Sequence, residues 1–224
     1  MRNIILIVSL LVSNLIYAQY GWTPAVVSLN NGKTLTGEAS IPMQNSGVGS
    51  IVKHKERVKF RLKKGSKKTK YDISEVSQIV FTISFTEKVD GEKIENTRTA
   101  KYVPVINKKR KKKVKKCFME EIVVGPISLY GRTVNAQGAI GPMNQTGTNI
   151  PMYHNYWMTH NELYVQKENE EAKLINQISL FKGFKKRASK YFGDCPAVVV
   201  QLEERELKKK DLKEIVELYN SNCG

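Results

Sequence analysis

Hydrophobic and polar residues alternate along the middle of the chain, most clearly in residues 57–63. Val58, Phe60 and Leu62 occupy every second position there, and each position between and around them is Lys or Arg. A period of two is typical of a strand with one face in the core and one in solvent. We therefore expect the three apolar side chains to be buried and the basic ones to be exposed.

Turn signals divide the neighbouring sequence into further strands. Residues 25–41 alternate on either side of Asn31-Gly32, and a β-branched, aromatic run precedes Asp90-Gly91. Asn-Gly and Asp-Gly are the dipeptides most typical of two-residue hairpin turns. The sequence therefore predicts a hairpin at each of these positions.

Farther along the chain the pattern is weaker. Residues 117–130 are predicted to form a strand interrupted near Gly125-Pro126, because proline cannot donate a ladder hydrogen bond. Residues 131–150 have no period, which predicts a long loop, either a mobile binding loop or disorder. A last hairpin is expected with its turn at residues 159–161.

The period becomes helical near Glu170, and a first helix is predicted from there to a glycine end at Gly193. Its inward face consists of Leu174, Ile178, Phe181, Ala188 and Phe192. Pro196–Leu202 is expected to be extended, and a second helix is predicted from about Lys210. The inward face of the second helix consists of Leu212, Ile215, Val216 and Tyr219.

These elements predict an α+β protein. An antiparallel β-rich N-terminal body, built as a small barrel or a twisted sheet, carries a two-helix C-terminal part packed on it. The predicted divisions are a signal peptide at residues 1–18, the β-rich body at 19–168 and the helical part at 169–224.

The start of the chain has the layout of a secretory signal peptide. Arg2 gives a positive start, Ile4–Tyr17 is a short apolar run, and Ala18 suits cleavage before Gln19. The run is shorter than the ~20 apolar residues that span a bilayer, and no later segment is apolar for long enough. We expect an exported chain, periplasmic or secreted, with no transmembrane segment after signal removal.

The chain is strongly basic, with 37 Lys and Arg against 21 Asp and Glu and a formal net charge of +16. A positive field attracts anionic partners such as acidic polysaccharide or lipid head groups, and export argues against a specific nucleic acid. The alternative interpretation is that the excess of Lys and Arg only keeps the protein soluble. Both interpretations stay open at this point.

Two tracts concentrate this charge: ten of the residues 53–70 and eight of the residues 108–116 are Lys or Arg. On neighbouring strands, the tracts would form one cationic patch able to hold phosphate or carboxylate groups. The alternative is two separate solvated faces. The predicted patch consists of Lys59, Arg61, Lys63, Lys111, Lys112 and Lys113.

Three cysteines, Cys117, Cys195 and Cys223, follow the signal peptide, and in an oxidising compartment two of them can pair. Cys195 and Cys223 each follow a helix-like segment and are predicted to form a disulfide. Cys117 lies in a strand-like run, where a buried thiol is favoured over a reactive one. A zinc site is the weaker alternative, because the chain has no Cys-x-x-Cys pair.

Known catalytic motifs are missing from the sequence. It has no His-Glu-x-x-His, Gly-x-Ser-x-Gly, phosphate-binding glycine-rich loop or EF-hand loop, and its four aspartates and three histidines are scattered. We therefore predict no enzyme, no cofactor and no metal site. A hydrolase of unknown type is kept as a minor alternative.

Two resemblances add to these observations. The strands and turns over residues 24–86, which open with VVSLNNGKTLTGE, are similar to small SH3-like or Sm-like barrels. The signal peptide, NNGKTLTG, GPISLY at 125–130, YFGDCP at 191–196 and the ending IVELYNSNC together resemble a group of uncharacterised exported envelope proteins of Bacteroidota. That resemblance implies export and a helical ending, and it transfers no catalytic residue. Its most specific positions are Tyr191, Phe192, Asp194, Cys195, Pro196, Tyr219, Asn220 and Cys223.

The predicted function is that of an exported, non-enzymatic protein that binds another component of the cell envelope. The alternative is a binder of anionic surfaces, such as acidic polysaccharide or lipid head groups, through the basic patch.

Overall fold

A computed structural model describes residues 21–41, 44–47, 56–89, 92–110, 113–143, 152–168, 170–176 and 183–224. The chain forms two compact units, and each combines two stretches of sequence. The first unit contains Met1–Pro42 and Arg57–Thr99, and the second contains Met43–Glu56 and Ala100–Gly224. The strands after residue 100 belong to the same unit as the helices. The division predicted at residues 19–168 and 169–224 stays a prediction.

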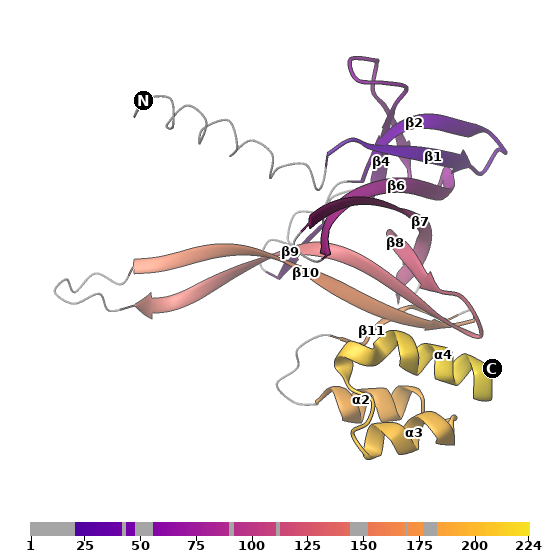
Figure 1. Cartoon of the computed structure of the whole chain (residues 1–224), viewed down its shortest axis with the longest axis vertical. Coiled ribbons are helices and arrows are strands. Elements are labelled where there is room, and N and C mark those ends of the chain that lie inside the picture. The colour runs from indigo at the N-terminus through magenta and orange to yellow at the C-terminus, as the bar shows by residue number, and fades with distance from the viewer. Residues whose placement is uncertain are drawn as a thin grey trace. The chain divides into compact units, whose positions relative to one another are not determined.

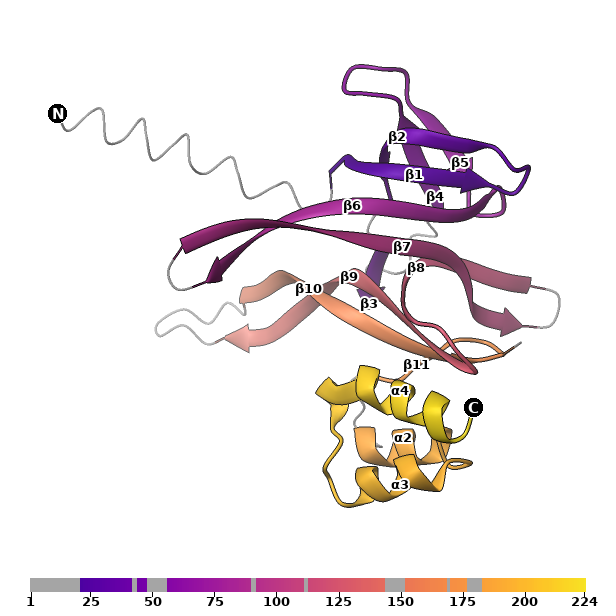
Figure 2. The same ribbon diagram turned by 45° about the vertical axis from the view of Figure 1, so that its right-hand side comes forward.

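The first unit is an antiparallel sheet with the strand order β6-β1-β2-β4-β5 (Figure 1; β5 is labelled in Figure 2). Its strands are β1 (Thr23–Leu29), β2 (Thr34–Ser40), β4 (Arg57–Arg61), β5 (Thr69–Asp72) and β6 (Val76–Val89), followed by the start of β7 (Glu92–Arg110). β5 lies at the end of this order, so the sheet is open. The small-barrel form of the fold prediction is therefore not confirmed.

β1 and β2 confirm the hairpin predicted at Asn31-Gly32. Gly32 has a φ of 82°, which a residue without a Cβ adopts readily, and its N–H donates to the carbonyl of Leu29 at 3.0 Å. The turn predicted at Asp90-Gly91 lies outside the described residues, between the end of β6 and the start of β7.

The alternation predicted for β4 holds at two of its three apolar positions. Val58 and Phe60 are 0% and 8% exposed, and full burial of such a side chain contributes about 1.5–3 kcal/mol. At Leu62 the prediction was wrong. β4 ends at Arg61 and the chain turns there, so the Leu62 side chain is 67% exposed. Among the described residues of this unit, the buried apolar ones are Ala25, Val27, Leu29, Ala39, Val58, Phe60, Val76, Ile79 and Phe81.

The second unit arranges its strands in the order β11-β10-β9-β8-β7. They are the remainder of β7, β8 (Lys113–Val123), β9 (Ile127–Met143), β10 (Met152–Lys167) and β11 (Lys173–Leu174). Neighbours in this order are antiparallel, and β3 (Gln44–Gly47) pairs in parallel with β9.

One prediction for this part is confirmed in position and two were wrong. The interruption predicted near Gly125-Pro126 is present, but it is the turn between β8 and β9 and not a bulge within one strand. The loop predicted at residues 131–150 is strand as far as Met143, and residues 144–150 lie outside the described residues. The turn predicted at residues 159–161 lies within the single strand β10. β9 and β10 pair along nearly their whole lengths, and this ladder satisfies the backbone where the residue types show no period.

Three helices follow: α2 (Phe184–Tyr191), α3 (Pro196–Glu203) and α4 (Leu212–Asn222), with the short 3-10 helix η3 (Lys209–Asp211) before the last. The sequence predicted two. The first predicted helix begins too early, because β11 occupies part of it. Ile178 and Phe181, two of its predicted inward residues, lie outside the described residues.

α3 replaces the extended segment predicted at Pro196–Leu202. Proline is favourable at the first position of a helix, and Val198 and Leu202, one turn apart, are both buried. Their burial outweighs the strand preference of consecutive valines, which is at most about 1 kcal/mol. α4 confirms the last predicted helix, and its buried residues are Leu212, Ile215, Val216 and Tyr219.

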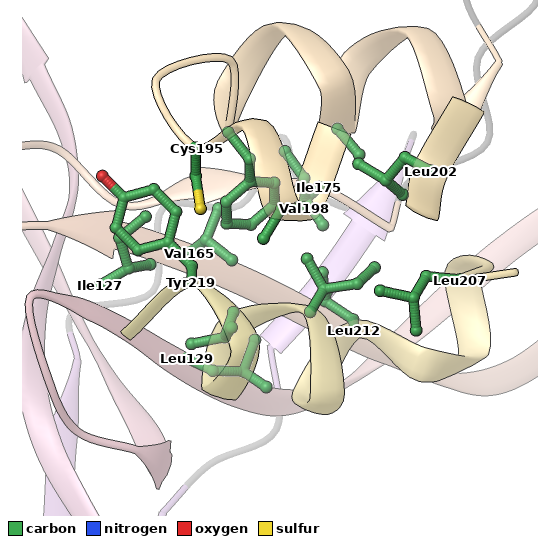
Figure 3. Close-up of a cluster of buried hydrophobic side chains, with 14 residues drawn as sticks. Ile127, Leu129, Val165, Ile175, Cys195, Val198, Leu202, Leu207, Leu212 and Tyr219 are labelled. Carbon is green, nitrogen blue, oxygen red and sulfur yellow. The ribbon is translucent and has the colours of Figure 1, made fainter. Parts of the chain in front are cut away.

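The helices pack on β9 and β10 through one apolar core (Figure 3). Ile127, Leu129 and Val165 come from the strands, and Val198 and Leu212 are among their helical partners. The prediction that the helical part packs on strands is therefore confirmed. Within the described part of the chain, no helix combines the length and the hydropathy that crossing a membrane requires.

Candidate anion-binding surface

β4 and β5 form an antiparallel hairpin rich in lysine at the end of the first sheet. Its connection turns at Gly65, whose φ is 88°, and the N–H of Ser66 donates to the carbonyl of Lys63 at 3.0 Å. A Cβ placed on Gly65 would meet no atom within 4 Å. The connection therefore projects into open space, and Figure 2 shows it rising beyond β2.

Six lysines of this hairpin are exposed, and none forms an ion pair with a described residue. We name this set the lysine face: Lys59, Lys63, Lys64, Lys67, Lys68 and Lys70. The two arginines of the hairpin differ, because Arg57 Nε lies 2.8 Å from Asp72 Oδ1 and Arg61 Nε contacts Glu38. The fold thus neutralises the arginines and leaves the lysines available to a ligand.

Strand register places two of these lysines directly opposite each other. Lys59 is the cross-strand partner of Lys70 in β5, and of Ser40 in β2. Directly opposite residues have Cβ atoms about 4.5–5.5 Å apart, and like charges there are destabilising. An anionic group bound between the two ammonium groups would remove this repulsion.

Trp22 adds an aromatic ring to the same surface, and sequence reasoning missed it. Arg61 Cζ lies 4.3 Å from the centroid of the Trp22 ring, and Lys68 Nζ lies 5.9 Å from it. Trp22 precedes β1, and the pairing of β1, β2 and β4 brings it to Arg61. No local pattern in the sequence indicates a contact that depends on three strands.

The other residues of the predicted patch lie elsewhere in the chain. Lys113 begins β8, in the second unit, whereas Lys59 belongs to the first. Lys111 and Lys112 lie outside the described residues. A single patch that joins the two basic tracts therefore stays a prediction.

The predicted disulfide is present in the second unit. Cys195 and Cys223 are bonded, with an S–S distance of 2.07 Å and a Cα–Cα distance of 5.7 Å. They stand immediately before α3 and immediately after α4. Cys117 is a free thiol in β8, and burial raises its pKa to about 12, which supports the buried role over the reactive one.

Polar side chains beside the disulfide form a second group, which we name the clasp: Lys167, Tyr191, Asp194 and Tyr219. Lys167 Nζ lies 2.6 Å from Asp194 Oδ2, and the Tyr219 hydroxyl donates to the same oxygen at 2.9 Å. The backbone N–H of Lys167 donates to the Tyr191 hydroxyl at 3.1 Å. These contacts fasten the end of β10 to the helices.

The pKa values in the clasp follow from this geometry. The hydrogen bond from Lys167 holds the pKa of Asp194 below its usual value. Burial opposes the charge of Lys167, but its contacts with Asp194 and Tyr219 outweigh that effect and raise its pKa. Burial raises the pKa of Tyr191 to about 12. At neutral pH the clasp is therefore a complete ion pair with neutral tyrosines around it.

The most specific positions of the Bacteroidota resemblance lie in the clasp, in the disulfide or next to them. Asn220 accepts a hydrogen bond from the N–H of Ile127 and donates one to its carbonyl, both at 2.9 Å. A Cβ on Gly125 would collide with the Asn220 amide, so a larger residue there would push this side chain away from Ile127. These motifs therefore describe how α4 is fastened to β9, and not a site open to a ligand.

A third polar group is buried in the second unit. Arg132 Nε lies 2.9 Å from Glu162 Oε2, and the Tyr164 hydroxyl donates to the same oxygen at 2.7 Å. Burial raises the pKa of Tyr164, so its hydroxyl remains a donor at neutral pH. Arg132 and Glu162 neutralise each other inside the protein, as Lys167 and Asp194 do nearer the surface.

Comparisons with protein-family models, with curated proteins and with solved structures returned no match. Among the described residues, no three or more His, Cys, Asp and Glu side chains gather as a metal ion would require. The lysine face gathers six exposed lysines that form no ion pair with a described residue.

Proposed function

We propose that the protein is an exported, non-enzymatic binding protein of the cell envelope, and that the lysine face binds an anionic component of that envelope. The pairing of Lys59 with Lys70 carries the proposal. Stability alone would favour an opposite charge at one of these positions, because opposite-charge pairs stabilise a sheet and like-charge pairs destabilise it.

Protection of the sheet edge is the competing explanation. Lysines on an edge strand discourage pairing with another chain, and β5 is an edge of this sheet. That role accounts for Lys70, but Lys59 lies on β4, which is paired on both sides. The lysines of the connection lie outside any strand and also need another explanation.

Export is supported by the signal-peptide layout of residues 1–18 and by the Cys195–Cys223 bond, since disulfides persist in oxidising compartments. We place the mature chain in the periplasm or outside the cell. Its mass should correspond to a chain that begins at Gln19. Recovery of the envelope-associated protein with Met1 intact would contradict this part of the proposal.

Binding to a soluble polyanion tests the surface. The affinity for heparin should fall steeply as salt rises, because bound polyanions release counterions. A triple variant with Lys59→Gln, Lys68→Gln and Lys70→Gln should bind roughly 100-fold more weakly, at about 1 kcal/mol for each lysine contact. Calorimetric titration of the wild type and the variant measures this difference.

A matched control removes the same charge from the helices of the second unit. Lys186, Lys209 and Lys210 are exposed there, and their triple change to Gln should leave the affinity nearly unchanged. Equal losses in the two triple variants would show that net charge alone drives binding and would overturn the proposal. Gln variants of Lys111, Lys112 and Lys113 measure what the second tract adds.

A further inference from the structure

The connection between β4 and β5 carries an exposed leucine among lysines. Leu62 is 67% exposed, and Lys63, Lys64, Lys67 and Lys68 follow it closely. It continues the apolar face of β4, but the strand has ended, so its side chain no longer reaches the core. The tip of the hairpin therefore combines an apolar side chain with four lysines that form no ion pair with a described residue.

We infer that this tip contacts the surface of an anionic lipid bilayer. Leu62 enters the boundary between head groups and acyl chains, and the four lysines of the connection bind the phosphate-bearing head groups around it. The inference rests on the proposed function and names its anionic component as lipid head groups.

Electrostatic attraction by the lysines and insertion of the leucine both contribute to the affinity of such a contact. Each lysine near an anionic surface raises the affinity about fivefold, so four raise it several-hundredfold. Burial of a leucine side chain adds about another tenfold or more. Reversible attachment to membranes typically needs both an apolar insertion and a polybasic patch, and this tip supplies both.

Val114 of β8 has a similar setting: it is 51% exposed and lies between Lys113 and Lys115, although a valine buries less apolar area than a leucine. Val124 is 68% exposed in the turn between β8 and β9, but the residues around it are not basic. Trp22 is half-buried, and the Arg61 guanidinium already lies against its ring. Within the hairpin tip, Leu62 is the residue whose removal separates lipid binding from polyanion binding, because a soluble polyanion gains nothing from a leucine.

The mature chain is tested by cosedimentation with vesicles of phosphatidylcholine alone and of equal parts phosphatidylcholine and phosphatidylglycerol. We expect binding to the anionic vesicles only. Leu62→Ser should lower that affinity about tenfold and leave heparin binding unchanged, and Leu62→Met should restore it. Val124→Ser, the matched control, should change neither.

The outcomes separate this inference from the proposed function. If Leu62→Ser binds anionic vesicles as well as the wild type, the insertion is refuted, although the heparin result for the lysine variants still stands. Heparin binding without any vesicle binding would also overturn the inference and would favour an acidic polysaccharide as the natural ligand. Loss of heparin affinity in Leu62→Ser would show that the leucine acts through the fold and not through lipid.

Discussion

The lysine face and the clasp use the same residue type in opposite ways. Lys167 of the clasp has a carboxylate at 2.6 Å and two tyrosine rings within 6 Å, at 5.7 and 5.5 Å from their centroids. Lys59 of the lysine face has another lysine opposite it. The clasp therefore stabilises the fold, whereas the lysine face costs stability unless an anion is bound. In a chain this basic, the groups that lie next to a charged side chain indicate its role better than the number of charged residues does.

The largest loss of stability that tests this comparison is expected from removing the disulfide beside the clasp. Cys195 and Cys223 are 28 positions apart, and closing a loop of that length lowers unfolded-state entropy by the equivalent of about 3.5 kcal/mol. Changing both cysteines to Ser should lower the free energy of unfolding by about this amount in urea titrations. Heparin affinity, which depends on the first unit, should stay the same.

Cys117→Ser serves as the control for the disulfide. Peptide mapping without reduction should still recover the bond between Cys195 and Cys223 in this variant. A bond from Cys117 to either of them in the wild type would contradict the structure. A double Cys→Ser variant as stable as the wild type would show that the clasp alone fastens the helices, and the comparison would then rest on Lys167 and Asp194.

The sequence predicted elements whose evidence is local. The Asn31-Gly32 turn, the alternation at Val58 and Phe60, and the helical period of α4 each lie within a few residues. The disulfide was also predictable, because both cysteines follow helix-like segments. The errors occur where distant contacts decide the structure: β9 depends on its ladder with β10, and α3 depends on burial against other elements.

The candidate site divides in the same way. Composition alone pointed to Lys59, Arg61 and Lys63, and the structure leaves Lys59 and Lys63 exposed. The sequence could not show that Arg61 is paired with Glu38, nor that Lys70 lies opposite Lys59, because both facts depend on the register between strands. An error of one residue in that register would turn these side chains to the other face.

Removing the carboxylate of the clasp should have a smaller effect than removing the disulfide. The Asp194 side chain is 52% exposed, so Asp194→Asn should lower the free energy of unfolding by at most about 1 kcal/mol at neutral pH. Its pKa is lowered in the folded state, so its contribution is complete above the usual carboxyl pKa of about 4 and is lost as pH falls through the folded value. The gap between wild type and variant should therefore close in acid. A gap that stays constant down to the acid limit of folding would mean that the charge of Asp194 is not what stabilises the clasp.

The smallest expected effect on the free energy of unfolding is an increase, whereas the effects at the disulfide and the clasp are decreases. Lys59→Gln removes the repulsion from Lys70 and should raise the free energy of unfolding by about 0.2–1 kcal/mol at low salt. The gain should shrink at high salt, where exposed charges are screened. Adding Lys70→Gln should give little more, because the first change has already removed the pair, so the double-mutant cycle isolates the repulsion. Lys186→Gln, on α2, should show no such gain.

The same Lys59→Gln variant should bind heparin more weakly. Stability and affinity therefore change in opposite directions at the lysine face, whereas loss of a charge at the clasp lowers stability alone. If Lys59→Gln instead destabilises the protein, Lys59 has a favourable partner and the main support for an unneutralised binding surface is lost.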